Sequence, residues 1–277
     1  MIKSKKHFAF LIGLPFTKIV QVAENINNYY YEKKEQKFNK DGSPRLVNGS
    51  PTYRILHPSK GILKTIIQRR IKSKILSKIV LPDNIQGGIK GKDNITNSKI
   101  HKGKKYHLVT DIKDFFPSIT NGQVFRMFKE NGFSNDIAHV ITKLTTYLGS
   151  VPQGAPTSTA VANLTFVKVD KALIDYCALH NITYSRFVDD LSFSSDKDFI
   201  PLVREMISII YKNGFKINRK KTHYKVGPVD ITGVNVRNNC LRPTKEFLEI
   251  YRHKKSSKPT KLGRKRYIRR IINEGKN

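Results

Sequence analysis

The sequence predicts an α+β protein in which helices pack on an antiparallel sheet. Residue patterns typical of helices occur at 62–76, 135–148 and 158–179. Two β-prone runs, 106–111 and 182–193, have the composition of strands, and the second is expected to fold back as a tight hairpin. The chain has 277 residues and 38% apolar content, which is enough for a real core in one domain of several lobes or in two small domains.

The first third of the chain mixes helical and strand signals. Residues 16–37 show a helix-like pattern that becomes increasingly polar, and residues 53–56 predict a short strand. Lys and Arg alternate with the apolar positions of the helix at 62–76, so this helix has one face for a core and another for phosphates. Residues 87–92 form a glycine-rich basic loop that suits a triphosphate, although its spacing is not that of a P-loop.

The remaining elements follow in order along the chain. The helix at 198–213 stops at Gly214. The tail, residues 252–277, carries 11 Lys or Arg against one Glu in an amphipathic pattern, which predicts a basic helix on a nucleic-acid backbone. The other predicted elements are a helix at 121–131, a Pro- and Gly-containing loop at 151–158, and strands at 230–236 and 240–242.

Three aspartates end strand-like runs. Asp189 and Asp190 lie at the tip of the predicted hairpin, and Asp111 ends the run at 106–110. Adjacent ionised carboxylates repel, and a divalent cation removes that penalty, although Asp-Asp is also an ordinary turn sequence. Two strands side by side would bring Asp111 to the hairpin tip. With no His or Cys nearby, the oxygen-only donors suit Mg²⁺ or Mn²⁺ rather than Zn²⁺.

Phosphoryl transfer is the reaction that most needs such a site. Two ions about 3.5–4 Å apart can activate an attacking hydroxyl and stabilise the leaving oxygen of an in-line displacement. The net charge points to a compatible substrate, because 52 Lys and Arg stand against 21 Asp and Glu, a formal charge of +31. This excess favours a polyanionic partner.

Nucleic acid is favoured over a membrane as that partner. No uninterrupted apolar run is long enough to span a bilayer, so we expect no membrane partner. The 12 Tyr and 15 Phe can stack on bases, although most of them should pack in the core. The two cysteines, Cys177 and Cys240, lie in apolar settings and predict buried thiols, which favours a reducing cytoplasm. The short apolar stretch 8–14 ends at Pro15 without a cleavage pattern and is not expected to be a signal peptide.

Four motifs, taken in order, resemble the palm motifs of reverse transcriptases. They are Asp-Ile-Lys-Asp-Phe-Phe-Pro-Ser-Ile from Asp111, Pro-Gln-Gly-Ala-Pro-Thr-Ser from Pro152, Phe-Val-Asp-Asp from Phe187 and Gly-Phe-Lys-Ile-Asn-Arg-Lys-Lys-Thr from Gly214. Within that superfamily, bacterial retron reverse transcriptases are most similar. Asn97-Ser98-Lys99-Ile100-His101 looks like their Asn-Ala-x-x-His element, and Ile231-Thr232-Gly233 looks like their Val-Thr-Gly element. The resemblance covers residues 14–243.

Three departures from the family pattern leave the acids untouched. Phe187 and Val188 stand where Tyr-Ala is usual, Ser98 replaces Ala, and Ile231 replaces Val. These departures put the subclass in doubt more than the activity.

The resemblance implies a right-hand polymerase fold. It assigns residues 1–105 to the N-terminal region and fingers, and 106–240 to a palm whose antiparallel sheet packs on helices. Finger or palm helices occupy 120–150, and 241–277 form a short basic thumb.

The resemblance also implies roles for single residues. Asp111, Asp189 and Asp190 would be catalytic and hold two Mg²⁺, or Mn²⁺, together with the backbone carbonyl of Ile112. Lys221 would protonate the departing pyrophosphate, with Lys220 beside it as the alternative. Residues implied to bind the deoxynucleotide are Arg54, Lys90, Ile112, Gln153 and Phe116, the last as a steric gate against the ribose 2′-OH. Residues implied to bind RNA are Asn97, His101, Thr232, Arg264 and Arg266, with a buried structural histidine as the alternative for His101.

The implied function is RNA-directed DNA polymerisation. Retron enzymes copy a structured non-coding RNA of the msr-msd type into single-stranded DNA, the msDNA, from a guanosine 2′-OH. We therefore expect a cognate RNA, its DNA product, deoxynucleotides and an effector protein as partners, with antiphage defence as the family's role. Two alternatives stay open. One is another defence-associated or group II intron-like reverse transcriptase, and the other is an RNA-binding scaffold without catalysis.

Overall fold

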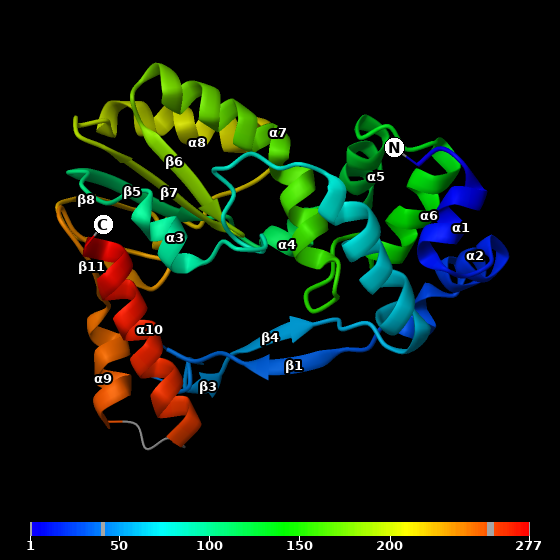
Figure 1. The fold of residues 1–277 in the computed structure, drawn as a ribbon, viewed down its shortest axis with the longest axis horizontal. Coiled ribbons are helices and arrows are strands. Elements are labelled where there is room, and N and C mark those ends of the chain that lie inside the picture. The colour runs from blue at the N-terminus through cyan, green and yellow to red at the C-terminus, as the bar shows by residue number, and fades with distance from the viewer. Residues whose placement is uncertain (1, 40–41, 254–257, 277) are drawn as a thin grey trace. The chain divides into compact units, whose positions relative to one another are not determined.

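A computed structural model describes residues 2–39, 42–253 and 258–276 (Figure 1). The chain divides into two compact units, each assembled from separate stretches of sequence. The first takes in Met1–Asn39, Ser43–Leu81 and Asp114–Val167, and the second Pro82–Lys113 and Lys168–Asn277. The long helix α7 (Ser158–Leu179) contributes to both, and its bounds agree with the prediction.

Local capping signals fix the helices of the first unit. The Ser4 side chain accepts from the backbone of His7 at the start of α1, and Gly13 ends this helix in a left-handed conformation (φ 62°). At α5, Thr120 and Gln123 form a reciprocal capping box. The α-helices of this unit besides α7 are α1 (Lys5–Ile12), α2 (Phe16–Glu24), α4 (Phe115–Ser118), α5 (Asn121–Glu130) and α6 (Asn135–Thr145).

The predicted helix at 16–37 is wrong in its second half. The helix α2 ends at Glu24, a 3-10 turn η1 (Ile26–Tyr29) follows, and β1 (Lys33–Gln36) pairs antiparallel with β4 (Tyr53–Leu56). The strand β1 is wholly polar, Lys-Lys-Glu-Gln, so its state is decided by a distant partner and not by its own pattern. The strand predicted at 53–56 is confirmed. Between β1 and β4 in sequence, two short strands, β2 (Leu46–Val47) and β3 (Ser50–Pro51), form a hairpin.

The predicted helix at 62–76 is wound mostly as π-helix, η2 (Leu63–Gln68) and η3 (Ile71–Ile75), before the 3-10 turn η4 (Leu76–Lys78). Gln68 has no exposed surface. Its amide nitrogen donates to the Tyr30 hydroxyl (2.7 Å) and the Leu144 carbonyl (2.8 Å), and its oxygen accepts from Ser59 (2.6 Å). Because each polar atom of this buried amide is paired, Gln68 can join three segments inside an apolar core.

The second unit is built on a four-stranded antiparallel sheet in the order β6-β7-β5-β8. The strands are β5 (Tyr106–Asp111), β6 (Thr183–Phe187), β7 (Asp190–Ser195) and β8 (His223–Val226). Helix α8 (Val203–Lys212), entered through the 3-10 turn η5 (Ile200–Leu202), lies on one face of this sheet, and α3 (Asn94–Lys99) lies on the other (Figure 1). The central strand β5 places Asp111 at its end.

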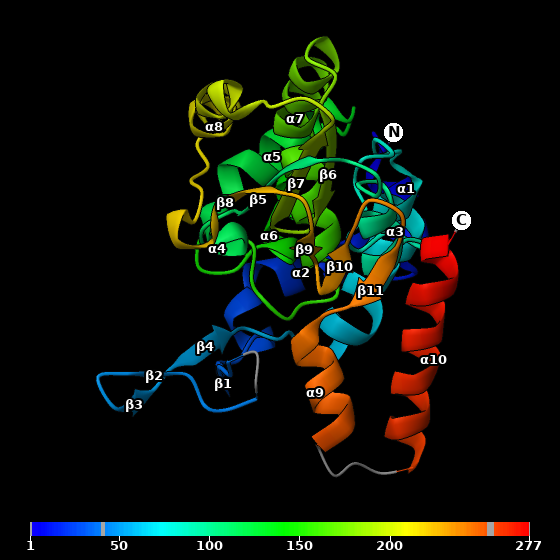
Figure 2. The same ribbon diagram turned by 90° about the vertical axis from the view of Figure 1, so that its left-hand side faces the viewer.

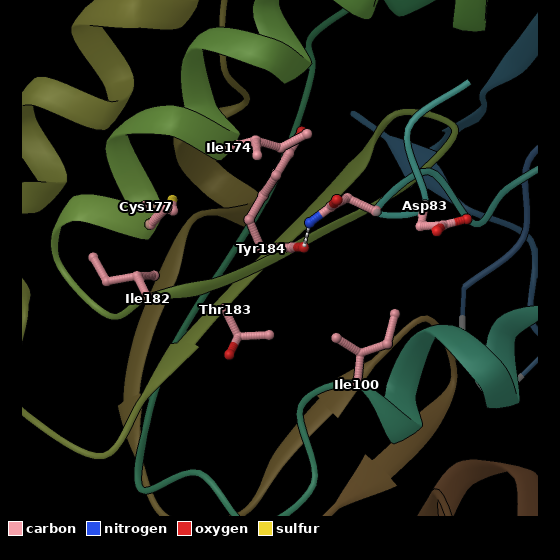
Figure 3. Close-up of a pocket in the computed structure, with 9 residues that line it drawn as sticks. Asp83, Ile100, Ile174, Cys177, Ile182, Thr183 and Tyr184 are labelled. Atoms are coloured by element: carbon pink, nitrogen blue, oxygen red, sulfur yellow. Dashed lines mark hydrogen bonds between the residues drawn. The ribbon is translucent and has the colours of Figure 1, made fainter. Parts of the chain in front are cut away.

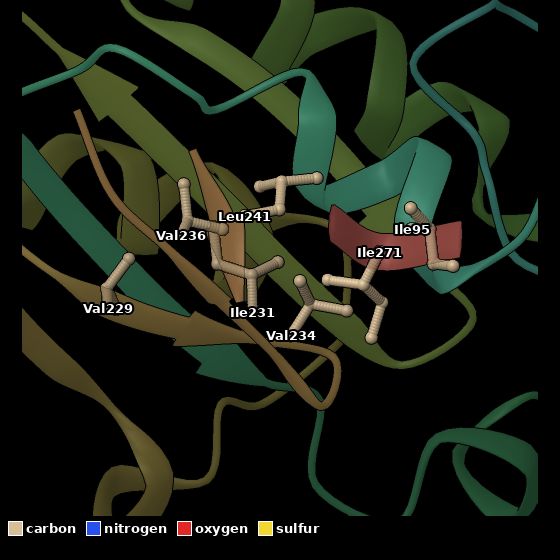
Figure 4. Packing of buried hydrophobic residues seen from close by; sticks show 7 residues of the cluster. All are labelled: Ile95, Val229, Ile231, Val234, Val236, Leu241 and Ile271. Atoms are coloured by element: carbon tan, nitrogen blue, oxygen red, sulfur yellow. The ribbon is translucent and has the colours of Figure 1, made fainter. Parts of the chain in front are cut away.

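A smaller sheet in the order β11-β10-β9 packs on α3. The predicted strand at 230–236 is wrong, because β9 (Val229–Ile231) and β10 (Val234–Val236) are two strands joined by a turn at Thr232 and Gly233 with φ 45° and 85°. Threonine rarely adopts a positive φ, so the turn was not evident from the sequence. The third strand is β11 (Leu241–Pro243). Figure 4 shows the apolar cluster formed by Ile95, Val229, Ile231, Val234, Val236, Leu241 and Ile271.

Two helices, α9 (Lys245–His253) and α10 (Lys258–Lys276), follow β11 and lie side by side (Figure 2). The predicted basic tail helix is confirmed over residues 258–276, whereas 254–257 and 277 lie outside the described residues. Ile271 buries its side chain in the cluster of Figure 4, and a Cβ on Gly275 would lie 2.4 Å from the Leu241 nitrogen. The helix therefore rests its C-terminal end directly on β11. Within the described part of the chain, no helix is long and apolar enough to cross a membrane.

Candidate active site

Sheet register brings two of the predicted acids together. Asp111 at the end of β5 is directly paired with Asp190 at the start of β7. The Ile112 amide donates to the Asp189 carbonyl (2.9 Å), and the Asn218 amide donates to the Asp111 carbonyl (2.7 Å). Directly paired residues of antiparallel strands extend their side chains to the same face. Three segments distant in sequence thus meet at one end of the sheet.

A tight hairpin presents the second and third acids. Phe187 on β6 pairs with Asp190 on β7, which leaves Val188 and Asp189 as the connecting residues. Val188 has φ 60°, the left-handed conformation, which is uncommon for a β-branched residue. The turn places two carboxylates in succession at the strand end.

The site is rich in negative charge. Burial, together with the charges of Asp189 and Asp111, raises the pKa of Asp190 to about 7, against an opposing effect of Lys221. The Lys221 ammonium donates to Asp111 Oδ2 at 2.8 Å; the Asp111 side chain is 7% exposed and that of Lys221 58%. Lys221 therefore neutralises Asp111 from the solvent side, and its predicted role at the pyrophosphate requires it to leave that position.

The donor set fits a hard divalent cation by its chemistry. Asp111, Asp189 and Asp190 supply carboxylate oxygens, and Asp190 holds its proton unusually tightly until positive charge is brought near. In the described ranges, no three His, Cys, Asp or Glu side chains form a ready-made ligand cluster, and Asp111 is engaged by Lys221. A cation would therefore complete its coordination by displacing the ammonium and drawing the carboxylates together.

A cavity of about 640 Å³ opens beside the acids. Its walls include Asp111, Asp190 and Lys221 on one side and the turn residue Thr232 with Tyr267 on another. The cavity joins the charged sheet end to an aromatic and polar wall, a combination suited to a nucleoside or its phosphate.

Two residues predicted to bind RNA, Asn97 and His101, have no exposed surface. The Ser185 hydroxyl donates its one hydrogen to Asn97 Oδ1 (2.7 Å). The Ser185 oxygen must therefore accept the hydrogen bond from His101 Nε2 (2.7 Å). The other ring nitrogen, Nδ1, then accepts from the Ser194 hydroxyl (2.7 Å). Burial lowers the pKa of His101 to about 3, which keeps the ring neutral. The structure favours the buried structural histidine.

This hydrogen-bonded chain ends at the third RNA prediction, Thr232. Asn97 Nδ2 donates to the Thr232 hydroxyl at 3.3 Å, and Asn94 donates to the Thr232 carbonyl at 3.0 Å. The Ser98 hydroxyl donates to the Ile231 carbonyl (2.9 Å). The family pattern has Ala at this position. The Asn-Ser-x-x-His element therefore fastens α3 to the β9–β10 turn, and only Thr232 of the three reaches the cavity wall.

The residues predicted to bind the nucleotide fall in both units. Lys90 is exposed in the loop after Gly87 in the second unit. In the first unit, Arg54 is exposed on β4, Phe116 is half-buried against Phe115 (ring centroids 5.6 Å), and the Gln153 carbonyl accepts from the His57 amide (2.8 Å). Their contacts with a nucleotide stay predictions.

The two arginines predicted on the tail helix differ in their surroundings. Arg266 is exposed on α10, and Arg264 is half-buried, with Nη1 at 3.5 Å from the Ile250 carbonyl of α9. Exposed Lys and Arg of α10 besides Arg266 are Lys261, Lys265, Arg269, Arg270 and Lys276. Of these, Arg270 pairs with Asp93 and Glu274.

The sequence analysis missed a buried ion pair between Asp170 and Arg186. Neither side chain has exposed surface, and Arg186 also donates to the carbonyl of the turn residue Val188. A signal existed, because Asp170 occupies the same apolar stripe of α7 as Phe166, Leu173 and Cys177. Opposite charges at core-facing positions of a helix and a strand indicate a buried pair.

Comparison with solved structures agrees with the fold. Telomerase from Candida albicans, solved in complex with a fragment of telomeric RNA, superposes with a TM-score of 0.51 at 10% identity, covering 82% of this chain and 50% of that one. Apo telomerase from Candida tropicalis gives 0.50 at 12% identity, covering 89% and 55%. The predicted fold class, that of reverse transcriptase polymerases, is confirmed.

The chain belongs to the family described as reverse transcriptase (RNA-dependent DNA polymerase), whose model matches residues 40–236. The retron Se72 reverse transcriptase of Salmonella heidelberg is 34% identical over 201 residues, which are 68% of this chain and 52% of that protein. The retron Mx65 reverse transcriptase of Myxococcus xanthus is 32% identical over 205 residues, 66% and 48%. The predicted resemblance to retron reverse transcriptases is confirmed. The chain spans about half the length of these curated relatives.

Proposed function

We propose that this chain is an RNA-directed DNA polymerase of the retron type, which copies a cognate structured RNA into single-stranded DNA. The observation that carries the proposal is the direct pairing of Asp111 with Asp190 at the sheet end, where Asp189 adds a third carboxylate. Family membership and the similarity to retron enzymes supply the class of reaction. The net charge of +31 supports a nucleic-acid substrate.

The residues present divide the chemistry among them. Asp111, Asp189 and Asp190, with the Ile112 carbonyl, would hold two Mg²⁺. When bound, such ions acidify the attacking hydroxyl and stabilise charge on the transferred phosphoryl group. Lys221 carries the proton that we assign to the leaving pyrophosphate, on the same Nζ that pairs with Asp111. Phe116 would exclude the ribose 2′-OH, and Arg54 and Lys90 would neutralise the triphosphate.

Partners and setting follow from the same proposal. We propose an msr-msd type RNA, its msDNA product and an effector protein as partners, and antiphage defence in the cytoplasm as the role. The supporting observation for RNA is the row of exposed Lys and Arg on α10.

Primer extension with purified protein, an RNA template and deoxynucleotides tests the activity. We expect synthesis with Mg²⁺, none with EDTA, and a loss of at least about a hundredfold for Asp189→Asn. Asp175→Asn, which changes an exposed acid on α7, is the matched control and should retain full activity. If Asp189→Asn extends primers as the control does, the proposed site is wrong. Sequencing of nucleic acid that co-purifies with the chain tests the retron-type substrate, which a joined RNA–DNA species would support.

A second candidate, an RNA-binding scaffold without catalysis, is favoured by one observation. The ammonium of Lys221 already neutralises Asp111. RNA binding without Mg²⁺-dependent extension in the same assay would select the scaffold.

A further inference from the structure

The residue before the two acids has an unfavourable backbone conformation. Val188 has φ 60°, where a β-branched side chain clashes with its own backbone. Such a conformation persists only where the surroundings hold it, and it is found preferentially at functional sites.

A buried guanidinium binds the Val188 carbonyl. Arg186 Nη1 donates to this oxygen at 2.8 Å. The other branches of the same guanidinium go to Asp170, with Nε to Oδ1 at 2.8 Å and Nη2 to Oδ2 at 2.7 Å. The Tyr184 hydroxyl donates to Asp170 Oδ1 at 2.8 Å. Helix α7 therefore fixes the orientation of the guanidinium, and the guanidinium fixes the turn.

The loop at 84–87 supports the turn from another direction. The Asn84 side chain donates to the Tyr184 carbonyl (2.8 Å, the dashed line at Tyr184 in Figure 3). The backbone N–H of Gln86 donates to the Arg186 carbonyl (2.8 Å). Gly87 then lies against the turn so closely that a Cβ there would be 2.4 Å from the Val188 nitrogen. Any other residue at 87 would push the turn away.

Stability alone does not explain a fully buried ion pair. Removing two charges from water costs so much that apolar replacements of similar volume are often as stable. The geometry points to a different use, because a planar guanidinium can bind a carboxylate with two branches and still present a third donor at a fixed angle. Here the third donor meets the Val188 carbonyl.

We propose that Asp170 and Arg186 are positioning residues that hold Val188 in its left-handed conformation and thereby present Asp189 and Asp190 to a divalent cation. The cation-binding part rests on the function proposed above. In this scheme the ion pair sets the geometry of the acids, and the bulk of the fold does not depend on it.

An apolar replacement of the whole cluster separates positioning from stability. The triple variant Asp170→Leu, Tyr184→Phe, Arg186→Met removes both charges and the hydroxyl that would lose its acceptor. Tyr184→Phe alone is the matched control. We expect the triple variant to fold with a melting temperature close to that of the control. Hydrogen exchange of the 187–191 backbone should be faster, and Mg²⁺ affinity by calorimetry should fall about tenfold or more, as for other residues that orient metal ligands.

Kinetics and a rescue variant sharpen the test. In primer extension, the triple variant should lower kcat with little change in the KM for template-primer, because the nucleic-acid contacts lie elsewhere. Adding Val188→Gly should recover part of the Mg²⁺ affinity, since glycine adopts a positive φ without a Cβ clash. Unchanged exchange and Mg²⁺ affinity in the folded triple variant would overturn the proposal. If that variant does not fold, Arg186→Lys, which keeps the charge beside Asp170 and removes the branch to Val188, is judged by the same measurements.

The two proposals fail in different ways. Hydrogen exchange needs no catalysis, so faster exchange in the variant together with an inactive native chain leaves the positioning role and removes the polymerase function. An active native chain whose turn exchanges equally in both proteins removes the positioning role and leaves the function.

Discussion

Asp111 and Asp190 face each other as directly paired residues of β5 and β7, at the end of the central strand pair of the sheet. This pairing concentrates negative charge where desolvation already disfavours it. Burial, with the charges of Asp189 and Asp111, raises the pKa of Asp190 to about 7. The only charged group acting in the opposite direction on Asp190, within the described residues, is Lys221. At the proposed metal site, a divalent cation would therefore exchange with a proton of Asp190 near neutral pH.

Mg²⁺ affinity should depend on pH through Asp190. The cation requires the carboxylate, so below about pH 7 it must displace a proton, and the apparent affinity should rise about tenfold per pH unit up to that point and then level off. Calorimetric titration at pH 6, 7 and 8 measures this. An affinity that does not change over that range would contradict the assignment of Asp190 as a ligand.

Without metal, Asp190 should make the folded protein less stable as pH rises, whereas Mg²⁺ affinity should increase with pH. The folded-state pKa of Asp190 lies above the ordinary 3.8, so the folded state binds more protons between pH 3.8 and about 7. The contribution of Asp190 to the free energy of unfolding is therefore present at low pH and lost as pH rises through 7. Thermal unfolding in EDTA should show this slope, and Asp190→Asn should remove it.

Lys221 should matter for the chemical step and Lys220 should not. Lys221 lies 2.8 Å from Asp111 and lines the cavity beside the acids, whereas Lys220 does not line that cavity. General acids contribute about 10²- to 10⁴-fold, so Lys221→Met should slow single-turnover extension by at least about a hundredfold. Lys220→Met is the matched control, with a rate close to that of the native chain. The reverse ranking would reassign the proton donor.

The convergence of the acids could be predicted because Asp111 and Asp190 each border an apolar run of the length of a strand. Antiparallel pairing then allows few ways to align those runs. Other features had no local signal. The polar strand β1 exists through its partner β4, and the turn at Thr232 places a threonine at φ 45°, held by hydrogen bonds from α3. Such elements depend on tertiary contacts that override local preference.

The Phe116→Ala variant tests whether Phe116 is the predicted steric gate. The ring is half-buried against Phe115, so truncation removes a contact on one side without opening the core. Phe116→Ala should raise ribonucleotide incorporation relative to deoxynucleotide incorporation by about 10- to 200-fold, the range of a steric change in a pocket. Phe115→Leu, at the buried neighbour, controls for packing and should not change this ratio. If both variants show the same ratio of ribonucleotide to deoxynucleotide incorporation, Phe116 is not the steric gate.

His101 should act on stability and on the β9–β10 turn without touching RNA. The ring is fully buried and pairs with Ser185 and Ser194, and its pKa of about 3 keeps it neutral at every physiological pH. His101→Ala removes the acceptor of the Ser194 hydroxyl and the donor to the Ser185 oxygen, which should lower the free energy of unfolding by about 1–3 kcal/mol. RNA affinity, measured well below the melting temperature, should stay close to that of the native chain and show no histidine-like pH dependence.

Arg266→Ala is the contrasting variant, because it removes an exposed charge and should reduce the salt dependence of RNA binding by about one phosphate contact with no loss of stability. A large drop in RNA affinity for a folded His101→Ala protein would contradict the expectation for that variant. It would show that the buried hydrogen bonds from His101 control the position of Thr232 at the cavity wall.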